Sequence, residues 1–195
     1  MRFNLSDVLE LIRSRRTLKP RAFSPRQIQR DQIEKMLEAA NWAPSHGLTE
    51  PWRFKVYAGE PLRQLLFTWA EIYKNITPPE KFLPERYEDI RNRASQCTAA
   101  ILTWMKRQDS EVIPEMEEYA ACACAIQNIA LVCTAYGISC FWSTGPVCYS
   151  RELHEYLGLG PKDKVVGLLY LGYPAGPWPE GRRSHWLNKT EWFGF

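Results

Sequence analysis

The chain has 195 residues, a length that suits one domain of ordinary size, and such a domain buries about 70% of its unfolded surface. Hydrophobic residues at 45% and charged residues at 24% match the averages of soluble globular proteins, which argues against a disordered or membrane-resident chain. Because 25 basic residues nearly balance 22 acidic ones, the net charge is only +3, and no basic face broad enough for a nucleic-acid duplex is indicated.

The sequence contains no run of about 18 apolar residues that would predict a membrane span. Its amphipathic start, MRFNLSDVLELI, lacks the apolar core and cleavage site of a signal peptide, so we expect a cytoplasmic protein. Five of the six cysteines fall mostly in apolar patterns that predict buried free thiols: Cys122, Cys124, Cys133, Cys140 and Cys148. No Cys-x-x-Cys or paired-histidine motif accompanies them, and we expect no metal site.

Two helices are predicted in the first part of the chain. Residues 5–14 repeat apolar side chains at helical spacing, with Ser6 as an N-cap. Ser24 and Pro25 predict the start of the second helix, as its cap and its first helical position. This helix ends near residues 41–47, and its apolar side chains repeat at i, i+3, i+4 and i+7: Ile33, Met36, Leu37 and Ala40.

A strand and a polar excursion follow. Residues 51–57 alternate between apolar and polar side chains, the pattern of a strand with one buried face. The polar, proline-marked stretch 77–94 carries a capping-box signature at Thr77 and Glu80. It predicts a mobile helical excursion over the surface, and we expect residues 76–95 to act as a lid.

The last part of the chain predicts three strands and two helices. Residues 99–105 form a continuous apolar run typical of a central strand, and 118–136 predict a long helix, apolar on most faces, that is buried in a core shared between subunits. Residues 138–142 and 165–172 predict two more strands with a short helix between them. This order indicates an α+β or mixed α/β fold. No Gly-x-Gly-x-x-Gly follows a strand, so a Rossmann or P-loop nucleotide site has little support.

The segment IRSRRTLKP, residues 12–20, concentrates four cations: Arg13, Arg15, Arg16 and Lys19. Arginines can hold a phosphate through paired hydrogen bonds, and Thr17 adds a neutral donor, so the segment suits a phosphorylated cofactor. The alternative is that these charges only complement the dipole of the preceding helix C-terminus and stay solvated.

A second polar segment is the loop NWAPSHGLTEPWRF, residues 41–54. His46 in such a loop is most often a surface residue, although a histidine can titrate near neutral pH. Trp42 and Trp52 are most often core residues, although two indoles that flank a polar loop can also enclose a planar ring.

Three motifs, in this order, resemble the nitroreductase family of flavoproteins, in its short branch, over nearly the whole chain: RSRRTLK, APSHGLTEPWRF and FWSTGP. The resemblance implies an α+β fold with a central mixed, mostly antiparallel sheet flanked by helices. It implies an intertwined homodimer that binds two FMN molecules at its interface. It also implies a single FMN-binding domain over residues 1–195, with a C-terminal extension over 174–195.

The resemblance assigns site residues as well. Arg15, Arg16 and Thr17 fall on the family's flavin motif and are expected to grip the FMN phosphate, with Lys19 at the polar edge of the flavin. The loop that reaches the flavin of the partner subunit falls on Pro44, Ser45, His46 and Gly47. The segment along the isoalloxazine ring falls on Trp142, Ser143, Thr144 and Gly145, and the C-terminal arginines of the phosphate site fall on Arg182 and Arg183. Leu48 and Glu50 stand where many members carry amides, and His46 is expected to substitute for them.

The function implied is an FMN-dependent oxidoreductase in which NADH or NADPH reduces the flavin and leaves, and a planar acceptor such as a nitroaromatic or a quinone then takes its place. The cofactor performs the chemistry, so no catalytic side chain is expected, and His46 or Trp142 would position the acceptor. The alternatives are a flavoenzyme of the same fold that performs dehalogenation, desaturation or flavin fragmentation, and a non-enzymatic FMN-binding redox protein. A nucleic-acid-binding module is disfavoured by the balanced charge.

Overall fold

The computed structural model describes residues 3–194, which contain six α-helices and four strands. In chain order they are α1 Leu5–Ser14, α2 Arg30–Asn41, β1 Trp52–Ala58, α3 Gly59–Ile76, α4 Pro84–Gln96, β2 Ala99–Met105, α5 Glu115–Ala135, β3 Ser139–Ser143, α6 Arg151–Leu157 and β4 Lys164–Gly172. The four predicted strands are all present, within two residues of their expected bounds.

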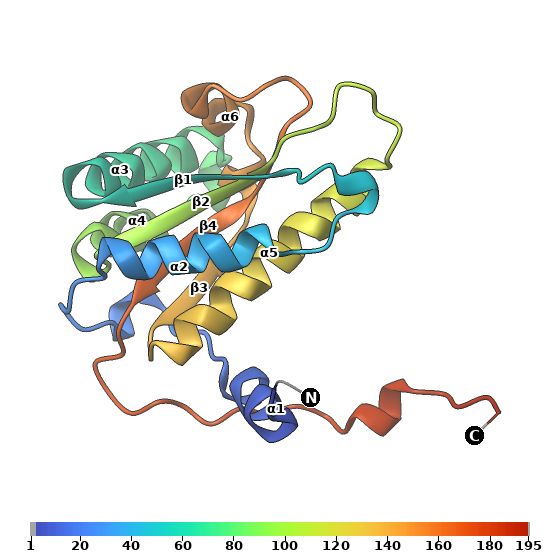
Figure 1. Ribbon diagram of the computed structural model, residues 1–195. Coiled ribbons are helices and arrows are strands. Elements are labelled where there is room, and N and C mark those ends of the chain that lie inside the picture. The colour runs from blue at the N-terminus through green and yellow to red at the C-terminus, as the bar shows by residue number, and fades with distance from the viewer. Residues whose placement is uncertain (1–2, 195) are drawn as a thin grey trace.

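The strands form one sheet in the order β1-β2-β4-β3. Helices cover both of its faces, with α2 and α5 on one side and α3, α4 and α6 on the other (Figure 1). Each face of the sheet has its own hydrophobic core, the first under α2 and α5 and the second under α3, α4 and α6. Ile101 of β2 packs into the first core and its neighbour Leu102 into the second, which explains the continuous apolar run of this strand. The expected α+β fold is confirmed, and all strand pairings among residues 3–194 are antiparallel.

The starts of α1 and α2 differ from the prediction. Asn4, not Ser6, caps α1, because its side chain accepts a hydrogen bond from the Ser6 backbone N–H at 2.9 Å. The predicted cap at Ser24 is wrong because the Ser24 N–H donates to the Tyr173 carbonyl at 2.7 Å, which holds this segment extended. The second helix begins only at Arg30, after a capping box that Gln29 forms with Gln32.

The segment between β1 and β2 is more ordered than the sequence suggested. The predicted order has no separate helix over 59–76, yet α3 buries an apolar stripe there: Leu62, Leu65, Leu66, Trp69, Ala70, Ile72 and Tyr73. The predicted capping box at Thr77 is wrong, because Thr77 is the C-cap of α3 and its hydroxyl donates to the Tyr73 carbonyl at 2.5 Å. Helix α4 then begins at Pro84 and buries Ile90 against the second core, so it is packed on the body. Its role as a lid stays a prediction.

Helix α5 is apolar on both of its long sides, but only one side is covered by the sheet and α2. The buried side includes Cys122, Ile126 and Ile129, whereas Met116 on the other side is 79% exposed. Contrary to the expectation from sequence, α5 is long and apolar enough to cross a membrane by length and composition, but 44% of that stretch is buried within this fold. Its open apolar side is therefore suited to a second protein surface.

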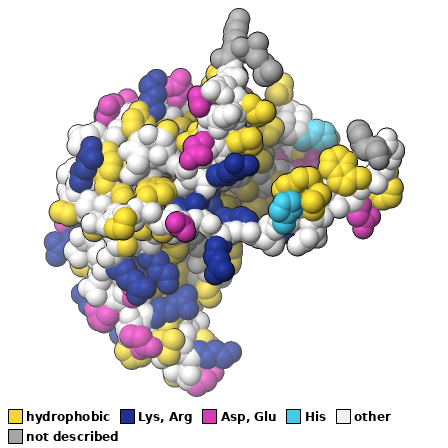
Figure 2. All heavy atoms as spheres, turned by 90° about the horizontal axis from the view of Figure 1, so that it is seen from below, with side chains coloured by type: hydrophobic (Ala, Val, Ile, Leu, Met, Phe, Trp, Pro, Cys, Tyr) yellow, Lys and Arg dark blue, Asp and Glu magenta, His cyan; other side chains and the backbone are white. Residues whose placement is uncertain are grey.

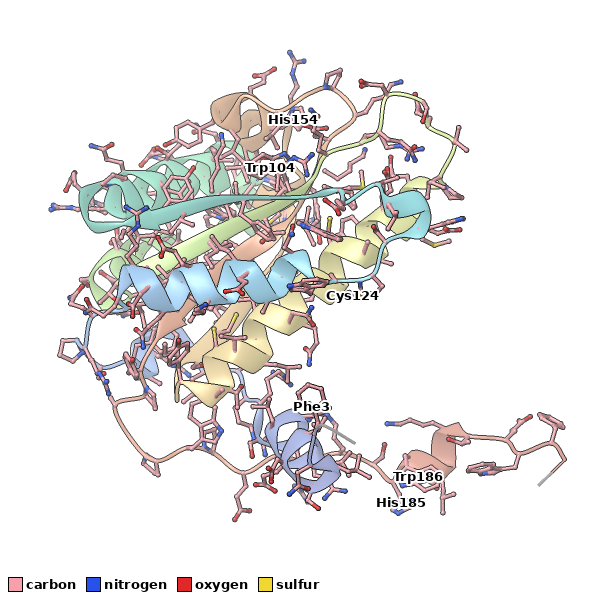
Figure 3. The ribbon with its side chains drawn as sticks, viewed as in Figure 1. Phe3, Trp104, Cys124, His154, His185 and Trp186 are labelled. Atoms are coloured by element: carbon pink, nitrogen blue, oxygen red, sulfur yellow. The ribbon has the colours of Figure 1, made fainter. Side chains whose placement is uncertain are left out.

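The described cysteines are free thiols without disulfides. The predicted burial is confirmed for Cys122, Cys133, Cys140 and Cys148 and is wrong for Cys124, which lies exposed on α5 (Figure 3).

Candidate functional site

The cationic segment after α1 is fixed between the sheet and the C-terminal part of the chain. The Leu18 backbone N–H donates to the Ser139 hydroxyl at the start of β3, at 2.9 Å. The Trp178 indole N–H donates to the Ser14 carbonyl at 2.7 Å, which brings the C-terminal segment alongside α1. Two parts of the chain that are far apart in sequence therefore lie side by side below the sheet (Figure 1).

A pocket of about 550 Å³ opens where these two segments meet. Its lining brings four arginines together with one residue of α5: Ile12, Arg13, Arg15, Arg16, Gln127, Gly181 and Arg183. Figure 2, which views the molecule from below, shows Lys and Arg side chains gathered near the place where the C-terminal segment leaves the body. None of the four arginines forms an ion pair with a carboxylate of residues 3–194, so the positive charge of this arginine pocket is not neutralised within that part of the chain.

Arg16 joins the two walls of the arginine pocket. Its Nε donates to the Pro179 carbonyl at 2.9 Å, and its Nη1 donates to the carbonyls of Arg13 and Arg15 at 2.5 and 2.7 Å. A Cβ at Gly181 would lie 2.2 Å from Arg16 Nη2, so only glycine allows this approach. Most donors of Arg16 are thus used within the chain, and Nη2 is the nitrogen left for a ligand.

The predicted phosphate residues are only partly together. Arg15, Arg16 and Arg183 line the pocket, and Thr17 lies beside it, since Arg15 Nη1 donates to its hydroxyl at 3.4 Å. Arg182, also predicted for the phosphate site, does not line it, and neither does Lys19, which was predicted for the polar edge of the flavin. Four lining residues were not among the predicted site residues: Ile12, Arg13, Gln127 and Gly181. Arg13 belongs to the cationic run itself and could have been found there, whereas nothing in the sequence marks Gln127, whose place depends on how α5 packs.

The loop with His46 stands at the start of α5, about two to three turns before the arginine pocket. His46 Nδ1 lies 2.5 Å from Glu117 Oε2, and the Ser45 hydroxyl accepts a hydrogen bond from the Glu50 N–H at 3.3 Å. The loop backbone is strained, because Leu48 and Glu50 adopt left-handed φ values of 54° and 43°. Since α5 rises 1.5 Å per residue, Glu117 and Gln127 stand roughly 15 Å apart along the helix. The loop of a single chain therefore does not line its own arginine pocket.

A buried ion pair supports this loop from beneath. Arg107, at the end of β2, donates to the carboxylate of Glu118 on α5, and the two side chains are 7% and 1% exposed. Arg107 Nη1 also donates to the Ile113 carbonyl at 2.7 Å. A Cβ at Gly47 would touch the Ile113 side chain at 3.2 Å, so the loop rests on the segment that Arg107 holds.

The WSTG segment, residues 142–145, lies beside an irregularity in the sheet. The register between β2 and β4 shifts at Thr103 and Trp104, and the Val166 carbonyl accepts a hydrogen bond from the Trp142 indole N–H at 3.0 Å. Gly167 is required there, because a Cβ would lie 2.2 Å from Trp142 Nε1. Beyond Trp142, which is 38% exposed, residues 143–145 border a small cavity of about 50 Å³ together with Arg86 of α4.

The buried thiols near this region offer no nucleophile. Burial raises the pKa of Cys122 and of Cys148 to about 12, so both thiols stay protonated at neutral pH. Burial likewise raises the pKa of Tyr119 to about 12.

Comparison with known proteins decides the family, because the model of the nitroreductase family matches residues 12–173. The chain belongs to the nitroreductase family. A Bacillus subtilis protein named "Putative NAD(P)H nitroreductase YfhC" is 30% identical over 166 residues, which are 85% of this chain and 83% of that protein. The crystal structure of a nitroreductase-like family protein from Bacillus cereus has a TM-score of 0.83 at 28% identity, with both chains covered completely.

Two further similarities bear on cofactor and chemistry. A Bacteroides fragilis nitroreductase structure with bound FMN is 25% identical, with a TM-score of 0.68 and coverage of 94% of this chain and 96% of that one. Iodotyrosine deiodinase of Hydra vulgaris is 24% identical over 80% of this chain and 61% of that protein. The matched region of this nitroreductase-family chain ends at Tyr173, before the segment that supplies Gly181 and Arg183 to the arginine pocket.

Proposed function

We propose that this protein is an FMN-dependent NAD(P)H oxidoreductase that reduces planar acceptors such as nitroaromatics or quinones. The observation that carries the proposal is the arginine pocket, whose uncompensated guanidinium groups suit a phosphate monoester. The residues fit the cofactor: Arg13, Arg15 and Arg183 would hold the phosphate, and Arg16 would add Nη2 while its other nitrogens keep the two walls in place. Bound FMN would supply hydride acceptance from NADH or NADPH and hydride donation to the acceptor.

The other predicted site residues position and shield the reactants. Trp142, held by the Val166 carbonyl, offers a fixed aromatic wall, and residues 143–145 contribute backbone amides. Lys19 would place its charge at the polar edge of the flavin, where negative charge develops on reduction. His46, bound through Nδ1 to Glu117, would present Nε2 to the acceptor, together with Pro44, Ser45 and Gly47 of the same loop.

We propose that the active form is a homodimer with FMN at its interface. An antiparallel pairing of the open sides of two α5 helices, centred near residue 122, would set Gln127 of one chain opposite Glu117 of the other. The His46 loop of one chain would then reach the arginine pocket of its partner. This pairing would account for the roughly 15 Å that separates the loop from the arginine pocket within one chain. The exposed apolar residues of the first helix and of the C-terminal segment support the same assembly: Leu5, Val8, Leu9, Ile12, Trp186, Leu187, Trp192 and Phe193.

We further propose that residues 1–195 act as one FMN-binding unit, with 174–195 as an extension that embraces the partner and 76–95 as a lid over the acceptor. Arg86 of α4, beside Gly145, supports the second role. The free thiols among the described residues are typical of a reducing compartment, which supports a cytoplasmic location.

The test is the visible absorption spectrum of the purified protein, with identification of the chromophore that denaturation releases. We expect a yellow protein that releases FMN and oxidises NAD(P)H with a nitroaromatic or quinone acceptor in ping-pong kinetics. Arg183→Ala should weaken FMN binding about tenfold or more, since charged hydrogen bonds contribute about 1.5–3 kcal/mol each. Arg182→Ala is the matched control, because Arg182 does not line the pocket. A colourless protein that also fails to take up added FMN would contradict the proposal.

A second chemistry is favoured by the similarity to iodotyrosine deiodinase. In that case the same bound FMN would serve reductive dehalogenation of a halogenated aromatic. Turnover with iodinated and nitrated phenols, compared on one preparation, distinguishes the two activities: release of iodide at a higher kcat/KM than nitro reduction would favour the dehalogenase.

A further inference from the structure

A second cleft lies at the opposite end of the sheet from the arginine pocket. The cationic segment is fixed at Ser139, which pairs with the last residue of β4. The second cleft surrounds the end of β2, which pairs with the first residue of β4. The cleft measures about 640 Å³, against about 550 Å³ for the arginine pocket, and the two share no lining residue. Its walls are the start of β1, the end of β2 and the turn between α6 and β4, and its Trp104 lies below α6 in Figure 3.

The register of β1 and β2 places an indole and several cations on one face of the sheet. Arg53 pairs directly with Trp104, and Lys55 follows Arg53 by two residues on the same face. The pairing continues past β2, because the Lys106 N–H donates to the Pro51 carbonyl at 2.8 Å, so Lys106 follows Trp104 on that face. All four of these side chains line the cleft.

Two of the cations are already oriented by backbone contacts. Lys55 Nζ donates to the Leu157 carbonyl at 2.5 Å and stands 5.6 Å from the centre of the Trp104 ring. Arg53 Nη1 donates to the carbonyls of Glu50 and Trp52 at 2.7 and 2.8 Å. Their positions are thus set before any ligand binds, which lowers the entropy cost of binding.

The cleft is short of negative charge to balance these cations. Among residues 3–194, Arg53, Lys55 and Lys106 form no ion pair. The Asp163 carboxylate on the wall accepts hydrogen bonds from the backbone N–H groups of Arg107 and Gly160, both at 3.1 Å.

Other charges of the lining offset part of this positive charge. Lys162 pairs with Glu111 and Arg107 pairs with Glu118, whereas Asp109 and Asp163 add two carboxylates to the cleft. The cleft is thus a concave surface with one aromatic wall, where three cations without an ion pair outnumber two acids, a combination that suits a planar ring with phosphate groups attached.

We propose that this cleft binds a purine nucleoside diphosphate, with the base against the Trp104 indole and the phosphates at Lys55, Lys106 and Arg53. The volume is within the range of nucleotide-sized pockets. The proposal does not depend on FMN, because the arginine pocket uses different residues at the other end of the sheet.

The experiment is calorimetric titration of the protein as purified with ADP, with adenosine and with inorganic pyrophosphate, while the visible spectrum reports any bound flavin. We expect saturable ADP binding that is tighter than that of either part alone and that releases no flavin. Trp104→Leu should weaken ADP binding about tenfold because the base loses its stacking partner. Lys106→Glu should weaken it by a similar factor because the charge that faces the phosphates is reversed. Lys74→Glu, the same charge change on the exposed side of α3, should leave it unchanged.

Three results would overturn the proposal. The first is no saturable binding of ADP. The second is pyrophosphate that binds as tightly as ADP, with no effect of Trp104→Leu, which would leave a simple anion site. The third is ADP binding that displaces flavin and ignores Lys106→Glu, because the nucleotide would then occupy the arginine pocket. Lys106 is exposed, so its substitution tests the cleft even if Trp104→Leu impairs folding.

Discussion

Arg16 and Gly181 are a pair of single residues on which the proposed phosphate site depends. Replacement of Gly181 with alanine would put a Cβ 2.2 Å from Arg16 Nη2 and force the guanidinium away from the Pro179 carbonyl. We expect Gly181→Ala to weaken FMN binding about tenfold, since the two N–H donors of Arg16 Nη2 no longer point into the arginine pocket. Gly176→Ala is the control, because a Cβ at Gly176 meets nothing within 4 Å. Equal FMN dissociation constants for the two variants, from fluorescence titration, would contradict the assigned role of Arg16.

Buried thiols give a second prediction for single residues, in alkaline solution. Burial raises the pKa of Cys97, Cys122 and Cys148 from an ordinary value of 9.0 to about 12. Between pH 9 and 12 the folded state holds more protons than the unfolded state, so the free energy of unfolding falls as pH rises. At pH 10.5 each such thiol should cost about 2 kcal/mol. Urea unfolding at pH 8 and pH 10.5 measures this fall in the free energy of unfolding. The fall should be smaller for Cys148→Ala than for the unaltered protein, whereas Cys124→Ala, at an exposed site, should show the same fall as the unaltered protein.

At the scale of elements, patterns in the sequence predicted what each strand buries but not what each helix end contacts. The continuous apolar run of β2 follows from burial of both its faces, which a local pattern can encode. Ser24 and Thr77 carry good cap chemistry, yet a tertiary hydrogen bond to Tyr173 holds Ser24, and Thr77 instead forms a local bond to the Tyr73 carbonyl one turn back. The same limit explains Gln127, because only the packing of α5 brings this exposed amide to the arginines.

The support beneath the His46 loop is an arrangement of elements, β2 against α5, that can be tested through the Arg107 and Glu118 pair. Arg107→Ala leaves a carboxylate buried without a partner and should lower the free energy of unfolding by about 3–5 kcal/mol. The double variant Arg107→Met with Glu118→Leu removes both charges and should recover most of that loss. Urea unfolding checks both, and an Arg107→Ala variant as stable as the unaltered protein would show that the pair contributes nothing.

At the scale of the whole molecule, the sequence motifs did not show how far apart the predicted parts of the site lie. The arginines, the His46 loop and the WSTG segment are each where the family resemblance put them in sequence, but in one chain they do not line one pocket. Sequence patterns are read within one chain, whereas assembly of these parts depends on symmetry between two. Figure 1 shows the C-terminal segment projecting from the body, and Figure 3 places His185 and Trp186 on it, far from the sheet.

The proposed dimer predicts the effect of one charge on the open side of α5. Ala120 is exposed there, and Ala120→Glu would bury a carboxylate, together with its symmetry mate, in an apolar interface. We expect this variant to elute as a folded monomer in size-exclusion chromatography with light scattering and to lose FMN, because the partner's loop no longer closes the pocket. Asn75→Glu, which adds the same charge on the exposed side of α3, should remain a yellow dimer. An Ala120→Glu protein that stays dimeric would place the interface elsewhere, and a monomer that retains FMN as tightly would mean that one chain completes the site alone.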